Sequence, residues 1–205
     1  MAGLDLAPKQ DPAIQISLKK DTTMNAIAAL SPYSSSVGKA NNERHTLSVL
    51  VDNEPGVLAR VVGLFSGRGY NIESLTVAEV AHVERWSRIT IVTTGSPAAI
   101  EQIGHQLERI VPIHKVVDLT LAGRAIEREL AMIKVRGKGE NRVEALRLAE
   151  AFKAKVIDAT LESFIFELTG APQKIDDFVE LMRPLGLVEL TRTGVAAIVR
   201  GSDAS

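Results

Sequence analysis

The segment RHTLSVLVDNEPGVLARVVGLFSGRGYNIESL, residues 44–75, contains the pattern that decides the fold. It opens with a predicted strand, residues 45–51, whose alternate apolar side chains share one face: Leu47, Val49 and Val51. Residues 52–56 (DNEPG) are typical of a turn followed by a helix start. The predicted helix carries an apolar face at the spacing i, i+3, i+4, i+7: Leu58, Val61, Val62 and Phe65. Gly67 and Gly69 mark its C-terminal end.

Working outward, residues 72–80 and 86–93 are rich in β-forming side chains and predict a hairpin. Ser96 is placed to cap a second helix that has Pro97 at its first position. That helix has one apolar stripe: Ile100, Ile103, Leu107 and Ile110. Residues 116–119 predict a fourth strand. The order of elements is therefore β-α-β-β-α-β.

The same order repeats after residue 129. Strands are predicted at 130–135, 155–159, 164–169 and 187–199, the last broken near Gly194. Two helices lie between them, the second opened by Pro172, with these apolar faces: Ala145, Leu148, Ala149, Phe152; and Ile175, Phe178, Val179, Met182. Two such units in tandem predict an α+β protein with two ferredoxin-like βαββαβ domains. In each domain the helices cover one face of an antiparallel sheet.

The predicted boundaries divide the chain into five parts. Residues 1–43, with Pro8, Pro12 and Pro32 and weak periodicity, are expected to be a disordered extension, or in part untranslated if synthesis starts at Met24. The first domain spans 44–121, a charged linker 122–129, the second domain 130–201 and a tail 202–205. In the first domain the sheet face away from the helices is expected to be uncovered and moderately polar, carrying Ser87, Thr90 and Thr93.

Composition limits the classes of function. The chain of 205 residues has no cysteine, which excludes disulfides, thiolate metal sites and cysteine nucleophiles. A net charge of −1 and 4% aromatic residues argue against nucleic-acid binding. No apolar run reaches the ~20 residues that span a bilayer, so we expect a cytoplasmic protein with no membrane partner.

The turn before the first helix predicts a binding site for an amino acid. Backbone N–H groups in the first turn of a helix lack internal partners and attract a carboxylate. Gly56 has no Cβ, so a ligand can approach the backbone there. Asn53 and Asn71 each offer an amide oxygen to an ammonium group, and Leu58 and Ile72 offer apolar contact. The same residues are also typical of an ordinary turn and helix cap, so spacing alone leaves both interpretations open.

With those residues in view, the chain resembles the small regulatory subunit of acetolactate synthase. Residues 63–75 are close to a signature of that family, and the resemblance continues through 88–93, 111–117 and 128–130. It implies an N-terminal ACT domain and a C-terminal ACT-like domain. It further implies a homodimer that binds valine between two ACT domains. Residues from one chain would contact the ligand, namely Asn53, Gly56, Val57 and Leu58, and Asn71 and Ile72 would do so from the facing chain.

The resemblance also implies what the chain lacks. It would have no catalytic residues, metal or cofactor of its own. Thiamine diphosphate, Mg²⁺ and FAD would bind only to the large catalytic subunit, its partner, for which the chain would be an activator and a source of valine inhibition. The preference among valine, leucine and isoleucine stays open.

Other features favour plain structural interpretations. Residues 136–140 (RGKGE) lack the Gly-Lys-Ser/Thr spacing of a phosphate loop and predict a turn. The four histidines are well separated, which argues against a metal site. Arg124, Arg128 and Glu129 are expected in a solvated junction. The rival functions are a free-standing amino-acid sensor that controls transcription and a ferredoxin-like enzyme such as an acylphosphatase. The first would need a DNA-binding element and the second a phosphate-binding arginine.

Overall fold

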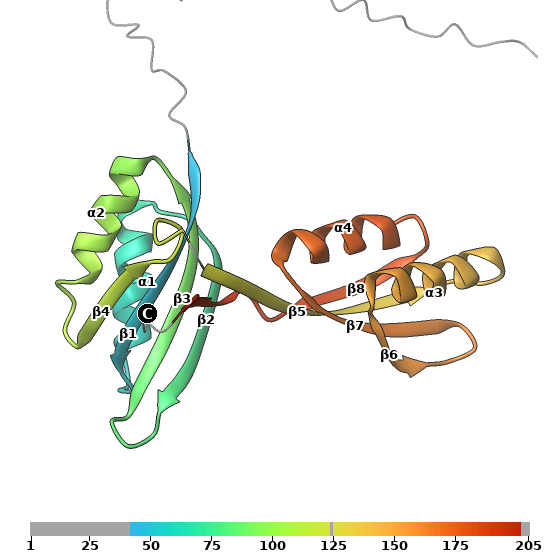
Figure 1. Ribbon diagram of the computed structural model, residues 1–205, viewed down its shortest axis with the longest axis horizontal. Coiled ribbons are helices and arrows are strands. Elements are labelled where there is room, and N and C mark those ends of the chain that lie inside the picture. The colour runs from blue at the N-terminus through green and yellow to red at the C-terminus, as the bar shows by residue number, and fades with distance from the viewer. Residues whose placement is uncertain (1–41, 124, 202–205) are drawn as a thin grey trace, which may run out of the picture. The chain divides into compact units, whose positions relative to one another are not determined.

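The computed structural model describes residues 42–123 and 125–201. The predicted disordered extension, apart from Asn42 and Glu43, lies outside the described residues, as do Arg124 and the predicted tail. The first domain contains β1 (Glu43–Asp52), α1 (Val57–Arg68), β2 (Ile72–Ala81), β3 (Trp86–Gly95), α2 (Pro97–Leu107) and β4 (Ile113–Asp118). Its antiparallel strands follow the order β2-β3-β1-β4, and residues of α1 and α2 share one core with the central strands (Figure 1). None of the described helices is long and apolar enough to cross a bilayer.

The second domain repeats this arrangement. It contains β5 (Ala125–Arg136), α3 (Glu140–Phe152), β6 (Lys155–Ala159), β7 (Ser163–Gly170), α4 (Pro172–Met182), β8 (Leu187–Arg192) and β9 (Ala196–Val199). The strand order β6-β7-β5-β8 matches that of the first sheet element for element. The predicted α+β class and the two βαββαβ units are confirmed (Figure 1).

The apolar stripes explain why these segments form elements. Leu47, Val49 and Val51 of β1 are each at most 2% exposed, as the alternation predicts. In α1 the buried residues are Val57, Val61 and Phe65, whereas Leu58 is 40% exposed. The prediction that Leu58 faces the core is therefore wrong. A stripe beginning at Val57 and one beginning at Leu58 fit the helical period equally well, and only packing against the sheet selects between them.

The outer face of the first sheet differs from the prediction, because this chain covers part of it. Residues 125–128 of β5 pair with β9 in a two-stranded ribbon. Side chains of this ribbon and of the segment before it form a small core with the outer face of the first domain: Val92, Val117, Leu119, Ala125, Val195, Ala197 and Val199. Thr90 lies on this outer face, but Ser87 and Thr93 alternate with Ile89 and Ile91 on the opposite, helix-covered side.

The ribbon also changes the predicted linker. Residues 125–129, expected to be a linker, are the first part of β5. The predicted break near Gly194 is confirmed, since β8 ends at Arg192 and β9 begins at Ala196. Gly194 has φ +83°, and a Cβ there would lie 2.7 Å from Ser74 Oγ. The Val195 amide donates to the same Ser74 Oγ at 2.9 Å, so the chain at this break lies directly against β2.

A second prediction in this region, that Glu129 is solvated, is also wrong. This residue is 6% exposed, and Arg192 of β8 donates to both of its carboxylate oxygens, at 2.7 and 2.5 Å. Arg192 also donates to Asp176 of α4 at 2.6 Å. The hydrogen bond with Glu129 raises the pKa of the guanidinium above its ordinary value, so Arg192 stays charged. Arg128 is exposed, as expected.

We predict that Arg192→Met lowers the free energy of unfolding by about 2 kcal/mol, because it leaves the buried Glu129 carboxylate without its bidentate partner. Lys134→Met is the matched control on the neighbouring strand. Lys134 pairs with Glu189 at 3.2 Å, but both side chains are well exposed. Its loss should cost less than about 0.5 kcal/mol. Urea denaturation of both variants gives the comparison, and equal losses would contradict a structural role for the Glu129–Arg192 pair.

Candidate functional site

The loop between β1 and α1 presents the start of α1 to solvent. Gly56 is the residue before the helix and has φ +89°, in the left-handed region. No side chain in the described part of the chain caps α1, and the first turn of this helix has no acidic residue. A Cβ built on Gly56 would meet no atom within 4 Å, so the space beside it is open. The Val57 amide donates to Glu54 O at 3.4 Å, and Val57 is buried. Gly56, Leu58 and Ala59 are exposed, so a bound anion can approach the turn at these residues.

This loop is held in place by contacts with distant parts of the first domain. The backbone amide of Asn53 donates to the backbone oxygen of Arg85, which lies in the β2–β3 turn, at 2.7 Å. The Asp52 amide donates to Pro112 O at 3.2 Å, and its carboxylate lies 2.6 Å from His114 Nε2 on β4. The His114 ring lies against Trp86 with centroids 5.1 Å apart. The Asp52 carboxylate is thus paired with His114, on the β4 side of the loop.

The polar side chains around the loop have defined partners. The side-chain amide of Asn53 donates through Nδ2 to Glu79 Oε2 at 3.4 Å. This hydrogen bond uses the NH₂ group of the side chain and not its oxygen. Arg60, one turn into α1, donates to Val111 O at 2.5 Å. Arg85, Pro112 and His114 were not predicted from the sequence as parts of this site. The contact between Asp52 and His114 joins residues 62 positions apart, and no local pattern signals such a contact.

The structure separates the predicted ligand residues into two groups. Gly56, Asn53 and Leu58 are exposed at the start of α1, while Val57 is 3% exposed and packs into the core. The whole residue is buried and its backbone amide donates to Glu54 O at 3.4 Å, so Val57 offers little surface to a ligand. Asn71 is exposed and Ile72 half-buried beyond the other end of the helix. A helix of 12 residues is about 18 Å long, so one chain does not bring the two groups together.

Asn71 is nevertheless held in a fixed position. Its backbone oxygen accepts from Thr93 Oγ1 at 2.6 Å, and Gly69 ends α1 with φ +70°. The exposed Asn71 side chain therefore starts from a defined backbone position between α1 and β2. A site that contains both asparagines requires a second copy of the chain.

The start of α3 in the second domain differs from that of α1. Its preceding residue, Gly139, has φ +59° and ψ −130°, and Glu140 places a carboxylate in the first turn. That negative charge occupies the end of the helix that attracts anions. The start of α3 therefore does not reproduce the features that make the start of α1 a candidate carboxylate site.

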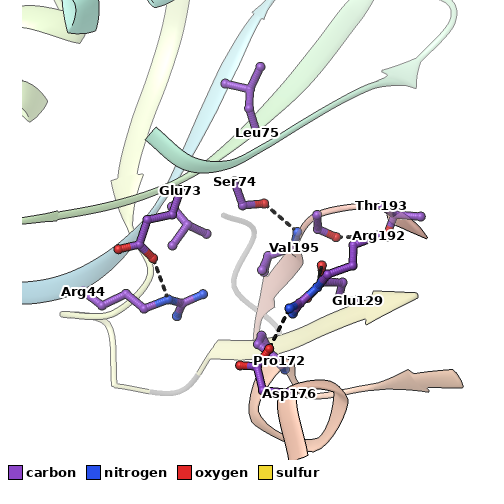
Figure 2. Close-up of a pocket in the computed structure, with 12 residues that line it drawn as sticks. Arg44, Glu73, Ser74, Leu75, Glu129, Pro172, Asp176, Arg192, Thr193 and Val195 are labelled. Carbon is purple, nitrogen blue, oxygen red and sulfur yellow. Dashed lines mark hydrogen bonds and ion pairs between the residues drawn. The ribbon is translucent and has the colours of Figure 1, made fainter. Parts of the chain in front are cut away.

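A cavity of about 490 Å³ lies between β2 and the segment that joins β8 to β9 (Figure 2). Its charged side chains are already paired with one another. Figure 2 shows Arg44 directed at Glu73, with Nε 3.4 Å from the carboxylate, and Arg192 between Glu129 and Asp176. Since each of these cations faces a carboxylate, we interpret this cavity as a structural junction rather than a ligand site.

Comparisons with known proteins agree in one family. The model described as "AHAS small subunit-like ACT domain" matches residues 47–115, and the model "Small subunit of acetolactate synthase" matches residues 128–201. The chain is 45% identical over 159 residues to a probable acetolactate synthase small subunit of Archaeoglobus fulgidus, an alignment that covers 78% of this chain and 98% of that protein.

Two further similarities have comparable coverage. An acetolactate synthase small subunit of Mycobacterium leprae is 43% identical over 157 residues, which cover 77% of this chain and 92% of that protein. The crystal structure of an acetolactate synthase small subunit from Thermotoga maritima superposes with a TM-score of 0.70 at 39% identity. That superposition covers 78% of this chain and 99% of the other.

We predict that Gly56→Ala lowers the free energy of unfolding by about 1 kcal/mol, because a Cβ is disfavoured in left-handed backbone even where space is open. Gly63→Ala is the matched control. Gly63 lies inside α1 and its added Cβ would also meet no atom within 4 Å. There the same substitution should stabilise by up to about 1 kcal/mol. Denaturation curves that move in the same direction for both variants would contradict a requirement for left-handed backbone at Gly56.

Proposed function

Because the chain belongs to the acetolactate synthase small-subunit family, we propose that it is a non-catalytic regulatory subunit that activates the large subunit and confers inhibition by valine. The observation that carries this proposal is the uncapped, accessible start of α1 beside Gly56. The large subunit is the proposed partner, and the proposed compartment is the cytoplasm.

The start of α1 suits the carboxylate of an amino acid. The helix end contributes roughly half a positive charge together with amide donors that have no partner within the helix. In the first turn of α1 there is no acidic side chain to compete with a ligand carboxylate. Binding there needs no lysine or arginine, which matches the absence of a cation from the predicted set of ligand residues.

The opposite end of the amino acid requires an acceptor and an apolar wall. We assign the ammonium group to the amide oxygens of Asn53 and of Asn71 from the facing chain. Leu58 is 40% exposed and is therefore free to contact an aliphatic side chain, with Ile72 of the facing chain on the other side. Gly56 contributes its backbone amide, and Val57 contributes its own by exchanging the hydrogen bond with Glu54 O for one with the ligand. The separation of the two groups by the length of α1 supports a site shared between two chains.

The proposed chemistry divides the holoenzyme between two subunits. Thiamine diphosphate, Mg²⁺ and FAD are assigned to the large subunit and none to this chain. Within residues 42–123 and 125–201 no three His, Asp or Glu side chains converge as metal ligands would. Valine bound by this chain and the large subunit bound to it must each change the affinity for the other by the same factor.

Gly56→Asp tests the carboxylate position. The added charge should weaken valine binding by about a hundredfold, or about 2.7 kcal/mol, because two carboxylates then compete for the same helix end. Aspartate and asparagine tolerate left-handed backbone better than most residues, so the fold should survive. Isothermal titration of the purified chain with valine measures the change. Assays with the large subunit should show that activation is kept while inhibition by valine is lost.

Two further variants separate the effect of the added charge from the effects of the added side chain and of its position. Gly56→Asn has nearly the same shape without the charge and should weaken binding less than Gly56→Asp. Gly63→Asp adds the charge inside α1, away from the loop, and should bind valine as the unsubstituted chain does. A normal valine response in Gly56→Asp would show that the site is misplaced. A chain that neither binds valine nor alters the activity of the large subunit would refute the proposed function.

A mixing experiment tests whether the site spans two chains. Asn53→Ala and Asn71→Ala should each abolish valine binding in a pure dimer. In a mixed dimer one of the two sites has both substitutions and the other has neither. Random mixing of equal amounts should therefore restore about a quarter of the sites, if the pairing is two-fold symmetric. No recovery in titrations of the mixture would mean that both asparagines act within one chain.

A further inference from the structure

A second surface feature of the first domain is a groove between α2 and the strands β1 and β4. Its volume is about 530 Å³, and its floor is apolar. Leu47, Ile100 and Val116 line it together with Gly104, whose missing side chain leaves room beside α2. At one edge Leu121 is 76% exposed. The groove therefore offers apolar area that the described chain leaves open to solvent.

The rim of the groove is acidic. Glu43, Glu101 and Glu108 line it with side chains that are 56%, 76% and 59% exposed. His105 lies 3.8 Å from Glu101 and 3.7 Å from Glu108, distances too long for hydrogen bonds. Among the described residues, no lysine or arginine lines the groove. Its rim therefore carries an excess of negative charge around an apolar floor.

His45 gives the groove a polar point within its floor. The residue is 3% exposed, and its Nδ1 lies 2.7 Å from Asp118 Oδ2. Its Nε2 has no hydrogen-bond partner among the described residues and lies 3.6 Å from the exposed Glu43 carboxylate. A buried polar atom without a hydrogen bond costs free energy, which a partner group in the groove recovers if it displaces the atoms that cover Nε2.

We propose that this groove binds a basic segment of the large subunit, in which an aliphatic side chain fills the apolar floor and flanking Lys or Arg residues meet the acidic rim. This proposal rests on the proposed function for the identity of the partner. Charge complementarity favours it over a second copy of the chain. A symmetric dimer through this face would bring two acidic rims together, which is unfavourable. The rim likewise disfavours an amino-acid carboxylate.

The groove and the proposed valine site share no residue. Within one chain, Asp52 and the loop after it lie at the end of β1 opposite to Glu43, which begins the strand. Ile72 lies toward the same end as His45, because both pair with Thr93, but it belongs to β2 at one edge of the sheet, whereas the groove is lined by α2, β1 and β4. Both sites can be occupied at once. A variant in the groove therefore leaves valine binding to the isolated chain intact, which makes the two proposals separable.

The test titrates fluorescently labelled full-length chain with purified large subunit. Glu101→Lys/Glu108→Lys should weaken association at least about tenfold, and more at low salt, because it reverses the rim charge. Gly104→Arg should weaken it similarly by filling the groove, whereas Gly104→Ala should not. An added Cβ at Gly104 meets no atom within 4 Å, and the residue is helical, so both variants should fold. Glu150→Lys/Glu180→Lys, an equal charge change on exposed positions of α3 and α4, is the control and should bind normally.

The outcomes of this test distinguish failure of the groove proposal from failure of the proposed function. Normal association of both groove variants overturns the groove while leaving the proposed function in place. Loss of self-association by Gly104→Arg in size-exclusion chromatography with light scattering would make a second copy the occupant and overturn the proposal. Failure of the unsubstituted chain to bind the large subunit overturns both proposals. Valine titrations of the groove variants should match those of the unsubstituted chain, and a matched loss there would place the groove within the valine site.

Discussion

The structure depends on the burial of both faces of one strand. β1 lies in the interior of the first sheet, with ten residue pairs to β3 on one side and a shorter ladder to β4 on the other. Leu47, Val49 and Val51 face the helices, while Thr46 and Ser48 on the opposite side are also buried. A shift of one residue in register would turn the apolar side chains to the other face, so the register of β1 is strongly specified. The position of the loop that follows β1 is therefore also well defined.

Burial on the outer side comes from the chain's own second domain. Thr46 Oγ1 donates to Glu127 of β5, and the Leu119 amide donates to Thr46 O at 2.9 Å. Glu127 also lies 3.2 Å from the Arg44 guanidinium, at the start of β1. The ribbon of β5 and β9 thus supplies partners for polar groups that a solvated sheet face would leave to water. This explains why a threonine occurs at position 46, on a face that the structure shows to be buried.

The helices and strands could be predicted from the sequence, but the long-range contacts between them could not. Strong alternation in β1, the glycine at the end of α1 and the Ser96 cap each act locally, and all three are confirmed. The choice between Val57 and Leu58 needed the sheet against which α1 packs. The pair of Glu129 and Arg192 joins residues 63 positions apart, and the pattern of a charged stretch gives no hint of it. The assignment of ligand residues stays a prediction, because one chain contains only half of each proposed site.

The rigidity of β1 constrains how a signal from valine can travel. The loop at its C-terminal end is tied to β4 through Asp52 and His114, and its N-terminal end contributes Glu43 and His45 to the acidic groove. A strand paired on both sides does not shift its register without breaking its ladders, so we do not expect a change at the loop to reach the groove by sliding of β1. A route consistent with this constraint is that the proposed valine signal acts on the pairing of two domains. Two grooves carried by paired domains then change their relative position together, and a large subunit that contacts both would respond to that change.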